Sequence, residues 1–366
     1  MRVLQIGTDR TIFDAKSASA ARMRSYGKRF GQLDMIIFSL REHKVRGIRL
    51  SEGAYALATN SFFRFLYLLD AIRIAFRLPK PDVVSVQDPF EAGITGWIIA
   101  RLRGAPLHVQ AHTDFLSPEF SRLSLLNRLR ALVAGFVLRR ASRVRVVSAL
   151  IKSSIEQKYK LRAPVSVLPI FVDVEKYRDS QLEPRLAARE HLFQTKLLVV
   201  ARLEREKNVG LAIHAFAKAA LDKSCLIIIG EGREKKALQK MAGDRGVGKW
   251  VFFEGQTDPA QYYKLADLLL APSLYEGYGM AIVEALASGT PVISTDVGVA
   301  REAGAIIAEE DDFAKALIAW SENGPREGKL ANYQYKNLAE YVEAYCKDME
   351  LSLNRTEDIN SAGEDR

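Results

Sequence analysis

The chain has 366 residues, enough for two domains of ordinary size. Apolar residues make up 48% and charged residues 27% of it, which are globular values and exclude a disordered or fibrous protein. Two isolated cysteines, Cys225 and Cys346, form no disulfide framework. No uninterrupted apolar run reaches ~18 residues, and the chain enters a strand-like run at Val3. We therefore expect no spanning helix, no signal peptide and a cytoplasmic protein.

The net charge of +9 is unevenly distributed. Residues 1–170 contain 28 Lys/Arg and 12 Asp/Glu, whereas the remainder contains 25 and 32. A basic first half followed by an acidic second half indicates an anionic surface or substrate that only the first half meets. The alternative is that the charge serves solubility alone.

Apolar runs alternate with helical patterns through the first half. We expect strands at 3–6, 35–38, 83–86, 107–110, 144–147 and 165–168, and helices at 19–30, 61–76, 91–102, 123–140 and 151–158. This order is typical of a parallel, doubly wound α/β sheet.

Two loops of the first half follow strands and carry candidate site residues. Gly7 ends the first strand, and His112 and Asp114 follow the strand at 107–110. Open α/β sheets bind ligands at the carboxyl ends of their strands, which favours a functional histidine over a structural one. Asp114 could orient His112 or bind a hydroxyl of an acceptor. Asp88 and Glu91 are weaker candidates for the same cleft.

Residues 123–140 form the most amphipathic stretch, with leucines alternating with arginines. A basic amphipathic helix can lie on an anionic membrane, each basic group adding ~1 kcal/mol near the surface. An ordinary domain helix with solvated arginines is the equal alternative. Nucleic acid is not expected, because no basic patch is interleaved with aromatic residues.

The second half restarts the alternation after a polar linker at 171–194. Strands are expected at 197–201, 225–229, 251–253, 268–271, 292–294 and 305–307, and helices at 209–221, 234–243, 259–266, 280–288, 312–320 and 330–353. Residues 354–366 are polar and predicted to be disordered.

Arg202 and Lys207 come directly after the strand at 197–201. Two cations at one strand end suit an anionic ligand such as a diphosphate, on which negative charge would grow if it were a leaving group. Two fixed cations would stabilise that charge more in the transition state than in the ground state. The arginine can grip two oxygens and the lysine acts as a point charge. Surface charge before a helix is the alternative.

The stretch from Glu276 to Glu284 follows the strand at 268–271 and leads into a helix. Gly277 and Gly279 allow a tight turn with uncovered backbone N–H groups, and a strand, turn and helix N-terminus together make an anion site. The two glutamates can accept hydrogen bonds from sugar hydroxyls. With its flanking residues the stretch resembles the signature of the retaining glycosyltransferases of family 4, the group 1 glycosyltransferases of GT-B fold. The residues that carry this resemblance are Pro272, Ser273, Glu276, Gly277, Gly279, Glu284, Ala285, Ala287, Gly289, Pro291 and Val292.

The resemblance implies two Rossmann-like domains that face each other across a cleft. Residues 1–170 would be the acceptor-side domain, 195–330 the donor-binding domain, and 331–353 a helix crossing back to the first domain. It implies catalytic roles for His112, Glu276, Arg202 and Lys207, with the histidine touching the donor sugar or its phosphate. The residues implied to bind the donor are Gly7, Arg202, Lys207, Glu231, Phe253, Gln256, Gly277, Tyr278, Gly279, Met280 and Glu284, of which Glu284 would meet the ribose. Ile170 and Phe171 replace the usual Asn-Gly pair between the domains, and the Gly7 loop lacks the family's other glycines.

The expected activity is transfer of a hexosyl-type group from a nucleoside diphosphate sugar to a glycan, lipid-linked or polyol acceptor. No Asp-x-Asp motif and no His/Cys cluster occurs, so we expect neither a metal nor another cofactor. The enzyme would be cytoplasmic, with an anionic membrane as a possible partner of its basic half. One alternative is a nucleotide-sugar epimerase of the same fold. The other is a catalytically silent protein that binds nucleotide sugar or membrane.

Overall fold

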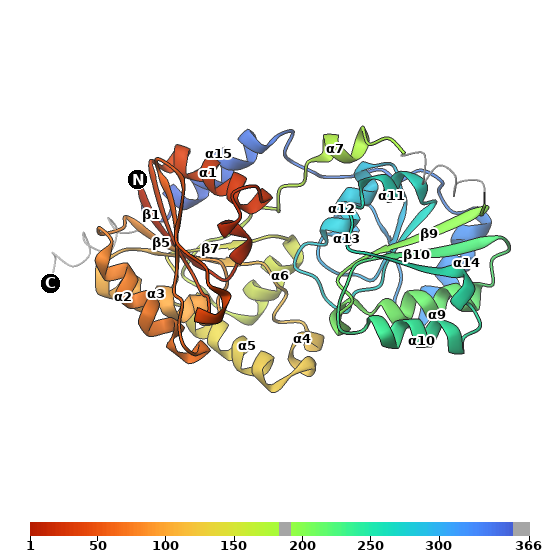
Figure 1. Cartoon of the computed structure of the whole chain (residues 1–366), viewed down its shortest axis with the longest axis horizontal. Coiled ribbons are helices and arrows are strands. Elements are labelled where there is room, and N and C mark those ends of the chain that lie inside the picture. Colours follow the sequence, from red (N-terminus) through yellow and green to blue (C-terminus); the bar gives the residue numbers. More distant parts are fainter. Residues whose placement is uncertain (183–191, 354–366) are drawn as a thin grey trace. The chain divides into compact units, whose positions relative to one another are not determined.

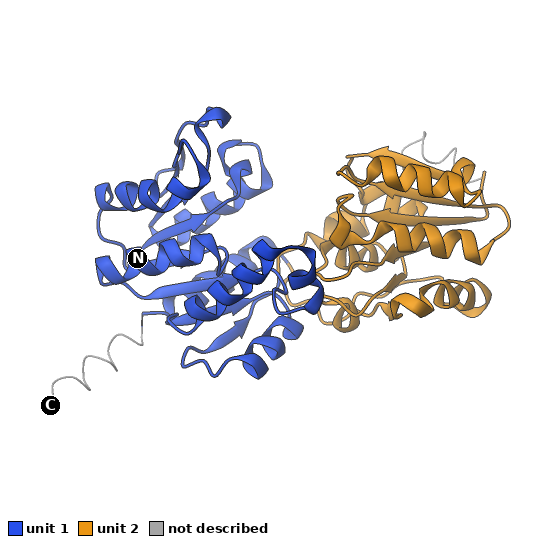
Figure 2. Ribbon diagram, turned by 90° about the horizontal axis from the view of Figure 1, so that it is seen from below, with its two compact units in different colours: residues 1–169, 337–366 blue, residues 170–336 orange. Residues whose placement is uncertain are grey.

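The computed structural model describes residues 1–182 and 192–353, and these divide into two compact units (Figure 1). Unit 1 consists of residues 1–169 with the chain from 337 onward, and unit 2 of residues 170–336 (Figure 2). The predicted tail at 354–366 and residues 183–191 of the predicted linker lie outside the described residues.

Unit 1 is built on an eight-stranded sheet in the order β3-β4-β2-β1-β5-β6-β7-β8. The strands are β1 (Arg2–Gly7), β2 (Gln32–Ile37), β3 (Ile48–Ser51), β4 (Ala54–Ala58), β5 (Val83–Val86), β6 (Leu107–Ala111), β7 (Arg143–Val146) and β8 (Val165–Val167). Neighbours pair in parallel except β3 and β4, an antiparallel hairpin at one edge. The sequence did not predict this hairpin, because both strands are short and only partly buried.

Helices cover both faces of this sheet, with α1 and α15 on one and α2, α3 and α5 on the other (Figure 1). They are α1 (Ala18–Phe30), α2 (Tyr67–Arg77), α3 (Glu91–Arg103), α4 (Pro118–Leu123), α5 (Leu125–Leu138), α6 (Ala149–Lys158) and α15 (Leu338–Glu350). Short 3₁₀ turns are η1 (Arg10–Phe13), η2 (Arg41–His43) and η3 (Arg64–Leu66). The prediction of a doubly wound sheet is confirmed.

Helix α15 joins unit 1 through a buried carboxylate. Asp348 is 5% exposed, and it accepts hydrogen bonds from Arg143 Nε and Ser166 Oγ, both at 2.6 Å. His108 Nε2 lies 3.1 Å from its other oxygen. These partners hold the pKa of the Asp348 carboxyl far below its usual range despite burial. The last helix is therefore fixed to the sheet by charge as well as by apolar packing.

Unit 2 contains a six-stranded, fully parallel sheet in the order β11-β10-β9-β12-β13-β14. Its strands are β9 (Thr195–Val200), β10 (Ser224–Ile229), β11 (Val251–Gly255), β12 (Leu268–Ala271), β13 (Val292–Ser294) and β14 (Ile306–Ile307). Its helices are α7 (Val174–Arg178), α9 (Val209–Ala219), α10 (Lys235–Asp244), α11 (Ala260–Leu265), α12 (Met280–Ala287), α13 (Ala300–Ala303) and α14 (Phe313–Asn323), with 3₁₀ turns η4 (Arg205–Lys207), η5 (Gly248–Trp250) and η6 (Glu310–Asp312).

The core of unit 2 lies between the sheet and helices α9 and α14, which pack against one another. Leu197 and Leu268 from the central strands meet Phe216 and Leu317 there, and all four are buried. Helices α11, α12 and α13 cover the opposite face (Figure 1). Because both faces are covered, the strands read as continuous apolar runs, which is why the sequence predicted them.

Two predicted helices begin later than expected. Residues 61–66 are not α-helical, because Ser61 exchanges backbone hydrogen bonds with Ser39 and Arg41, at 2.9 and 3.0 Å, as a continuation of the sheet. Residues 330–336 are not helical, because Ala331 N donates to Ala303 O at 2.9 Å and the Tyr333 hydroxyl bonds the backbone of Val172. The second case shows that this stretch belongs to unit 2 rather than to α15.

The amphipathic stretch predicted at 123–140 becomes α5, and its apolar side is not fully covered. Leu125 and Leu132 are 78% and 74% exposed, whereas Val137 and Leu138 near its end are buried. An ordinary domain helix would bury its leucines and expose its arginines. The first two turns of α5 depart from that pattern.

Candidate active site

The sheet of unit 2 reverses its strand order at β9 and β12, which pair directly although they are distant in the sequence. The chain crosses from β9 to β10 on one side and returns to β12 on the other. In open α/β sheets a crevice lies outside the carboxyl ends of the strands at such a switch point. The loop after β9 carries Arg202 and Lys207, and the loop after β12 carries Glu276, so the fold brings these predicted residues together.

Lys207 and Glu276 form an ion pair across this switch point. Lys207 Nζ donates to Glu276 Oε1, and Ser273 Oγ donates to the same oxygen at 2.9 Å. The two charged side chains are 16% and 18% exposed, so the pair is largely shielded from water. A cation and a carboxylate thus lie side by side, and an arriving anion would compete with Glu276 for Lys207.

Arg202 is more accessible than Lys207. Its guanidinium is 71% exposed and donates to Glu206 Oε1 at 2.8 Å. The hydroxyl of Tyr275 interacts electrostatically with Arg202 and with the carboxylates of Glu206 and Glu276. Burial and the carboxylates of Glu206 and Glu276 raise its pKa to about 12, against the opposing effect of Arg202. A long, exposed arginine can turn toward a ligand with little loss of packing.

The glycine-bearing turn before α12 fits the predicted anion site. Gly279 is the N-cap with φ of 91°, a left-handed conformation that favours glycine, and α12 has no side-chain cap. The first N–H groups of the helix and its dipole therefore face outward. Gly298 supports the turn from below: a Cβ there would lie 2.3 Å from Tyr278 O, and Val299 N donates to that oxygen at 2.9 Å.

Glu284 lies inside α12 and is only 7% exposed. The hydroxyl of Tyr263 donates to its Oε2 at 2.7 Å. Burial raises the pKa of the Glu284 carboxyl, although the hydrogen bonds from Tyr263 and Tyr177 act in the opposite direction. Glu284, which is predicted to bind the ribose, thus already accepts hydrogen bonds from two tyrosines. The sequence did not indicate these tyrosines.

The remaining donor candidates lie at the ends of β10 and β11, one strand farther along the same edge. Glu231 pairs with Lys235 at 2.6 Å, Phe253 packs against the core, and Gln256 is exposed. Gly230 permits the close approach of the chain after β10 to the chain after β9, because a Cβ there would lie 1.9 Å from Ala201 O. The carboxyl ends of β9, β10 and β11 therefore lie at one edge of the sheet, and Arg202 follows the first of them.

In unit 1, strands β1, β5 and β6 are neighbours, so the loops after them also meet at one edge. Gly7 ends β1, and a Cβ there would collide with the side chain of Gln87. Asp9 then accepts hydrogen bonds from Thr11 N, Thr11 Oγ1 and Ser19 Oγ at 3.0, 2.6 and 2.7 Å. Side chains rather than further glycines shape this loop.

His112 is held by a buried network that fixes its tautomer. Arg145 donates to Gln110 Oε1 at 2.7 Å, and because a guanidinium cannot accept, the amide oxygen of Gln110 must face it. His112 Nε2 lies 3.1 Å from the same oxygen and must therefore carry the proton. Burial and the charge of Arg145 lower the pKa of His112 to about 3. The imidazole is neutral, and its Nδ1 can accept a hydrogen bond.

The carboxylates near His112 differ in their environments. Asp114 Oδ1 is buried and has no hydrogen-bond partner within residues 1–182 and 192–353, and burial raises the pKa of that carboxyl. Asp88 follows β5, and burial raises its pKa to about 6, although Phe90 N donates to its Oδ1 at 2.8 Å. A buried oxygen without a partner in the fold is a ready acceptor for a ligand hydroxyl.

Several residues of these networks carry no local sequence signal. Tyr345 of α15 accepts from Gln110 Nε2 at 3.0 Å, and Tyr341 accepts from Arg145 at 2.9 Å, across 235 and 196 residues. Nothing in the flanking sequence of either tyrosine marks it. Across the described part of the chain, no group of three or more His, Cys, Asp or Glu side chains is placed to hold a metal ion, and no helix is long and apolar enough to cross a membrane.

Two family models match this chain. Residues 30–176 match the model described as Glycosyltransferase Family 4, and residues 188–337 match the model described as Glycosyl transferases group 1. Each match covers most of one structural unit.

Among curated proteins, the chain is similar to two that are named alpha-monoglucosyldiacylglycerol synthase. It is 26% identical to the one from Streptococcus pneumoniae, over 76% of this chain and 69% of that protein. It is 25% identical to the one from Acholeplasma laidlawii, over 79% of each.

Among solved structures, sucrose-phosphate synthase from Thermosynechococcus elongatus superposes with a TM-score of 0.73 at 15% identity, covering both chains fully. The Anabaena protein HepE, solved in complex with UDP-glucose, superposes with a TM-score of 0.67 at 19% identity, over 99% of this chain and all of that one. These likenesses concern the fold.

Proposed function

Because the chain belongs to the group 1 glycosyltransferases of family 4 and has their GT-B fold, we propose that it moves a hexosyl group from UDP-glucose or a related UDP-sugar with retention of configuration. The acceptor would be a glycan, a lipid-linked molecule or a polyol in envelope or glycoconjugate synthesis. The observation that carries the proposal is the Lys207–Glu276 pair beside the uncapped start of α12. Cation, carboxylate and free N–H groups are what a sugar diphosphate requires.

The proposed binding step is an exchange of partners. The diphosphate takes Lys207 away from Glu276 and also meets Arg202 and the N–H groups from Gly277 to Met280. Glu276, once released, accepts hydrogen bonds from hydroxyls of the sugar, and Glu284 meets the ribose. Charge grows on the diphosphate as the glycosidic bond breaks, so these fixed cations stabilise the transition state more than the bound substrate. The two cations carry the charge that a metal carries elsewhere.

His112 and Asp114 would contribute acceptors rather than donors. His112 is neutral with its Nε2 proton committed to Gln110, so its Nδ1 accepts from a sugar hydroxyl and does not donate to a phosphate. Asp114 Oδ1 offers a second acceptor. His112 would meet a hydroxyl of the donor sugar and Asp114 a hydroxyl of the glycosyl acceptor, because each residue offers an atom that can accept a hydrogen bond.

The acceptor half would also meet an anionic membrane surface. Residues 1–170 carry the excess of Lys and Arg, and the leucines of α5 are exposed beside them. Two relatives named for a glycolipid product support a lipid-linked acceptor in particular. The enzyme would then be cytoplasmic and peripheral on the inner face of the membrane.

A donor screen followed by product analysis tests the proposal. We expect UDP-sugars to raise the melting temperature more than GDP- or ADP-sugars, with and without EDTA. Labelled UDP-glucose should yield free UDP and a product with the α configuration by NMR. Formation of a free, epimerised sugar nucleotide would show that the protein is an epimerase and not a transferase. Binding without any turnover would indicate a catalytically silent protein that binds nucleotide sugar.

A further inference from the structure

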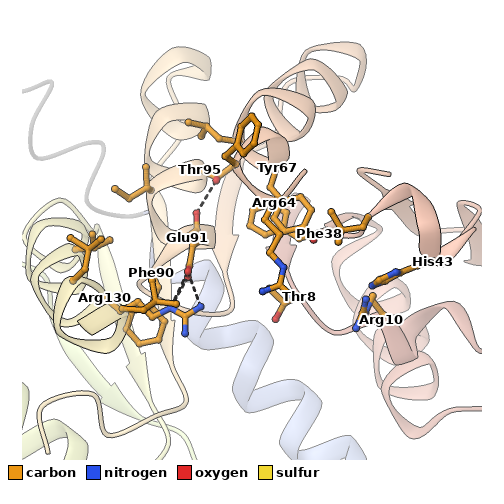
Figure 3. A pocket seen from close by; sticks show the side chains of 17 residues that line it. Thr8, Arg10, Phe38, His43, Arg64, Tyr67, Phe90, Glu91, Thr95 and Arg130 are labelled. Atoms are coloured by element: carbon orange, nitrogen blue, oxygen red, sulfur yellow. Dashed lines mark hydrogen bonds and ion pairs between the residues drawn. The ribbon is translucent and has the colours of Figure 1, made fainter. Parts of the chain in front are cut away.

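A pocket of about 670 Å³ opens in unit 1 at the edge where β1, β2 and β5 end (Figure 3). Its walls come from the loops after these strands and from η3, α2, α3 and α5. The volume is within the range of about 300–1,000 Å³ that small-molecule sites occupy. This pocket could not be predicted from the sequence, because the lining residues are spread from Thr8 to Val133.

The lining of this pocket suits an apolar chain better than a sugar. Glu91, its one carboxylate, is held by Arg130 through contacts of 2.7 to 3.2 Å (Figure 3). The Thr95 hydroxyl donates to the backbone oxygen of Glu91 at 2.8 Å. A sugar needs open carboxylate or amide acceptors, and these groups are already engaged. Apolar side chains supply much of the rest: Phe38, Leu40, Phe65, Leu68, Phe90, Ile94, Leu126, Leu129 and Val133.

Large apolar side chains continue from the pocket onto the protein surface. Phe65, Leu126 and Leu129 line it and are still 75%, 52% and 56% exposed. We call these three residues the rim. Beyond the rim, α5 also exposes Leu125 and Leu132, α2 exposes Leu69, and the residues just before η3 expose Phe62 and Phe63. A cluster of this size on both walls of one pocket differs from the single exposed apolar residues of ordinary surfaces and marks an interaction site.

The charges around the rim identify the kind of surface it meets. Arg10, Arg64, Lys44 and Arg46 border this pocket or the smaller basic hollow beside it. No carboxylate forms an ion pair with any of these four side chains within residues 1–182 and 192–353. Exposed leucine and phenylalanine beside unpaired cations complement an anionic lipid surface, where chains are apolar and headgroups negative.

We propose that the pocket receives the apolar chain of a lipid acceptor, drawn from a bilayer in which the rim is seated. This deepens the proposed function and rests on it. The hydroxyl end of the acceptor lies toward Thr8 and Arg10, which follow β1 (Figure 3). The chain runs toward α5, which contributes Leu126 and Leu129 to the lining. A glycan or polyol without a chain leaves the apolar walls in water and binds weakly.

Binding of a chain is tested on the full-length protein without any transfer reaction. A dansyl-labelled undecyl alcohol should bind at one saturable site and be displaced by dioctanoylglycerol. The double variant Leu126→Glu with Leu129→Glu should weaken binding at least tenfold, because two carboxylates then face the chain. The matched control is Leu102→Glu, which alters a leucine that is 59% exposed on α3 but does not line the pocket, and it should bind as the wild type does.

A variant of a second pair of exposed leucines distinguishes binding in the pocket from binding to the membrane surface. Leu125→Glu with Leu132→Glu leaves the lining unchanged and should retain probe binding. It should reduce flotation with phosphatidylcholine–phosphatidylglycerol vesicles, and added salt should reduce the flotation of the wild type. In transfer assays with dibutyryl-, dihexanoyl- and dioctanoylglycerol, KM should fall with chain length, by at most about fourfold per buried methylene.

The outcomes distinguish this inference from the proposed function. No saturable probe binding by the wild type, or equal binding by the Leu126/Leu129 variant, overturns the inference. If the leucine variants instead change the oligomeric state of the protein, the rim is an interface between copies and the inference is equally overturned. UDP-induced stabilisation and release of UDP from UDP-glucose are measured on every variant, because their absence in the wild type would refute the proposed function itself.

Discussion

The two units present their functional edges in opposite ways. In unit 2 both predicted site glutamates already accept hydrogen bonds, Glu276 from Lys207 and Glu284 from Tyr263. In unit 1 a neutral histidine lies at one edge of the sheet, with an aspartate oxygen that has no hydrogen-bond partner in the part of the chain that the structure describes. An open apolar pocket with exposed leucines lies at the same edge. The difference indicates that a charged ligand is met by exchangeable ion pairs and an apolar one by uncovered surface. Four changes test this contrast.

The largest expected effect concerns the attachment of α15 to the sheet of unit 1. Asp348→Ala removes the one carboxylate that Arg143, Ser166 and His108 share. Loss of one partner in a buried ion pair costs about 3–5 kcal/mol. We expect the free energy of unfolding, measured with urea, to fall by that amount. Glu343→Ala, which breaks a solvent-exposed pair with Arg29, should lower the free energy of unfolding far less, because exposed ion pairs contribute little. Equal losses would mean that α15 is held by packing alone.

The next effect is catalytic and belongs to unit 2. Lys207→Ala should lower turnover of UDP-glucose roughly hundredfold or more, which is typical for loss of a group that stabilises developing charge. Arg202→Ala should lower it at least tenfold. Lys240→Ala changes a lysine that is paired with Asp244 on the exposed side of α10, and it should leave turnover unchanged. Unchanged turnover in both site variants would remove the leaving-group role.

Asp88 offers a smaller effect that depends on pH. Its pKa in the fold is about 6, against an ordinary value near 4, so the folded state binds the proton more tightly than the unfolded state. The carboxylate therefore destabilises the fold increasingly as the pH rises from about 4 to 6. Asp88→Asn, which keeps an acceptor for Phe90 N, should be up to about 3 kcal/mol more stable than the wild type at pH 8 and about equally stable at pH 4. The same difference at both pH values would contradict burial as the cause.

The smallest effect concerns the tautomer of His112. Gln110→Glu keeps the acceptor for Arg145 and places a carboxylate 3.1 Å from His112 Nε2. A nearby opposite charge should raise the pKa of His112 from about 3 by roughly one to two units, followed by NMR titration of the ring. Ser85→Ala removes another partner of Gln110 without adding charge and should leave the pKa within about one unit of its starting value. No response to the glutamate would mean that Gln110 does not orient the histidine.

The same contrast explains how much the sequence could predict. Arg202, Lys207 and Glu276 follow strands directly, and a parallel sheet brings strand ends to one edge, so local pattern was enough to place them together. The buried strands of unit 2 could also be predicted, because each is a continuous apolar run. The predicted family and fold are confirmed.

The rest depends on contacts that no local pattern encodes. The tyrosines on Glu284 and the Arg145–Gln110–His112 network come from residues far apart in the sequence. The exposure of the leucines of α5 could not be predicted either. Periodicity predicts that a helix has an apolar face, but it does not predict whether another element covers that face. The delayed starts of α2 and α15 likewise come from tertiary hydrogen bonds.

A crystal structure with bound UDP tests the central claim most directly. The account predicts that the diphosphate lies within hydrogen-bond distance of Lys207 Nζ and of the N–H groups at the start of α12, and that Glu276 has left the lysine. A diphosphate bound at another edge of the sheet would contradict it. So would a bound diphosphate beside a Lys207–Glu276 pair that remained intact.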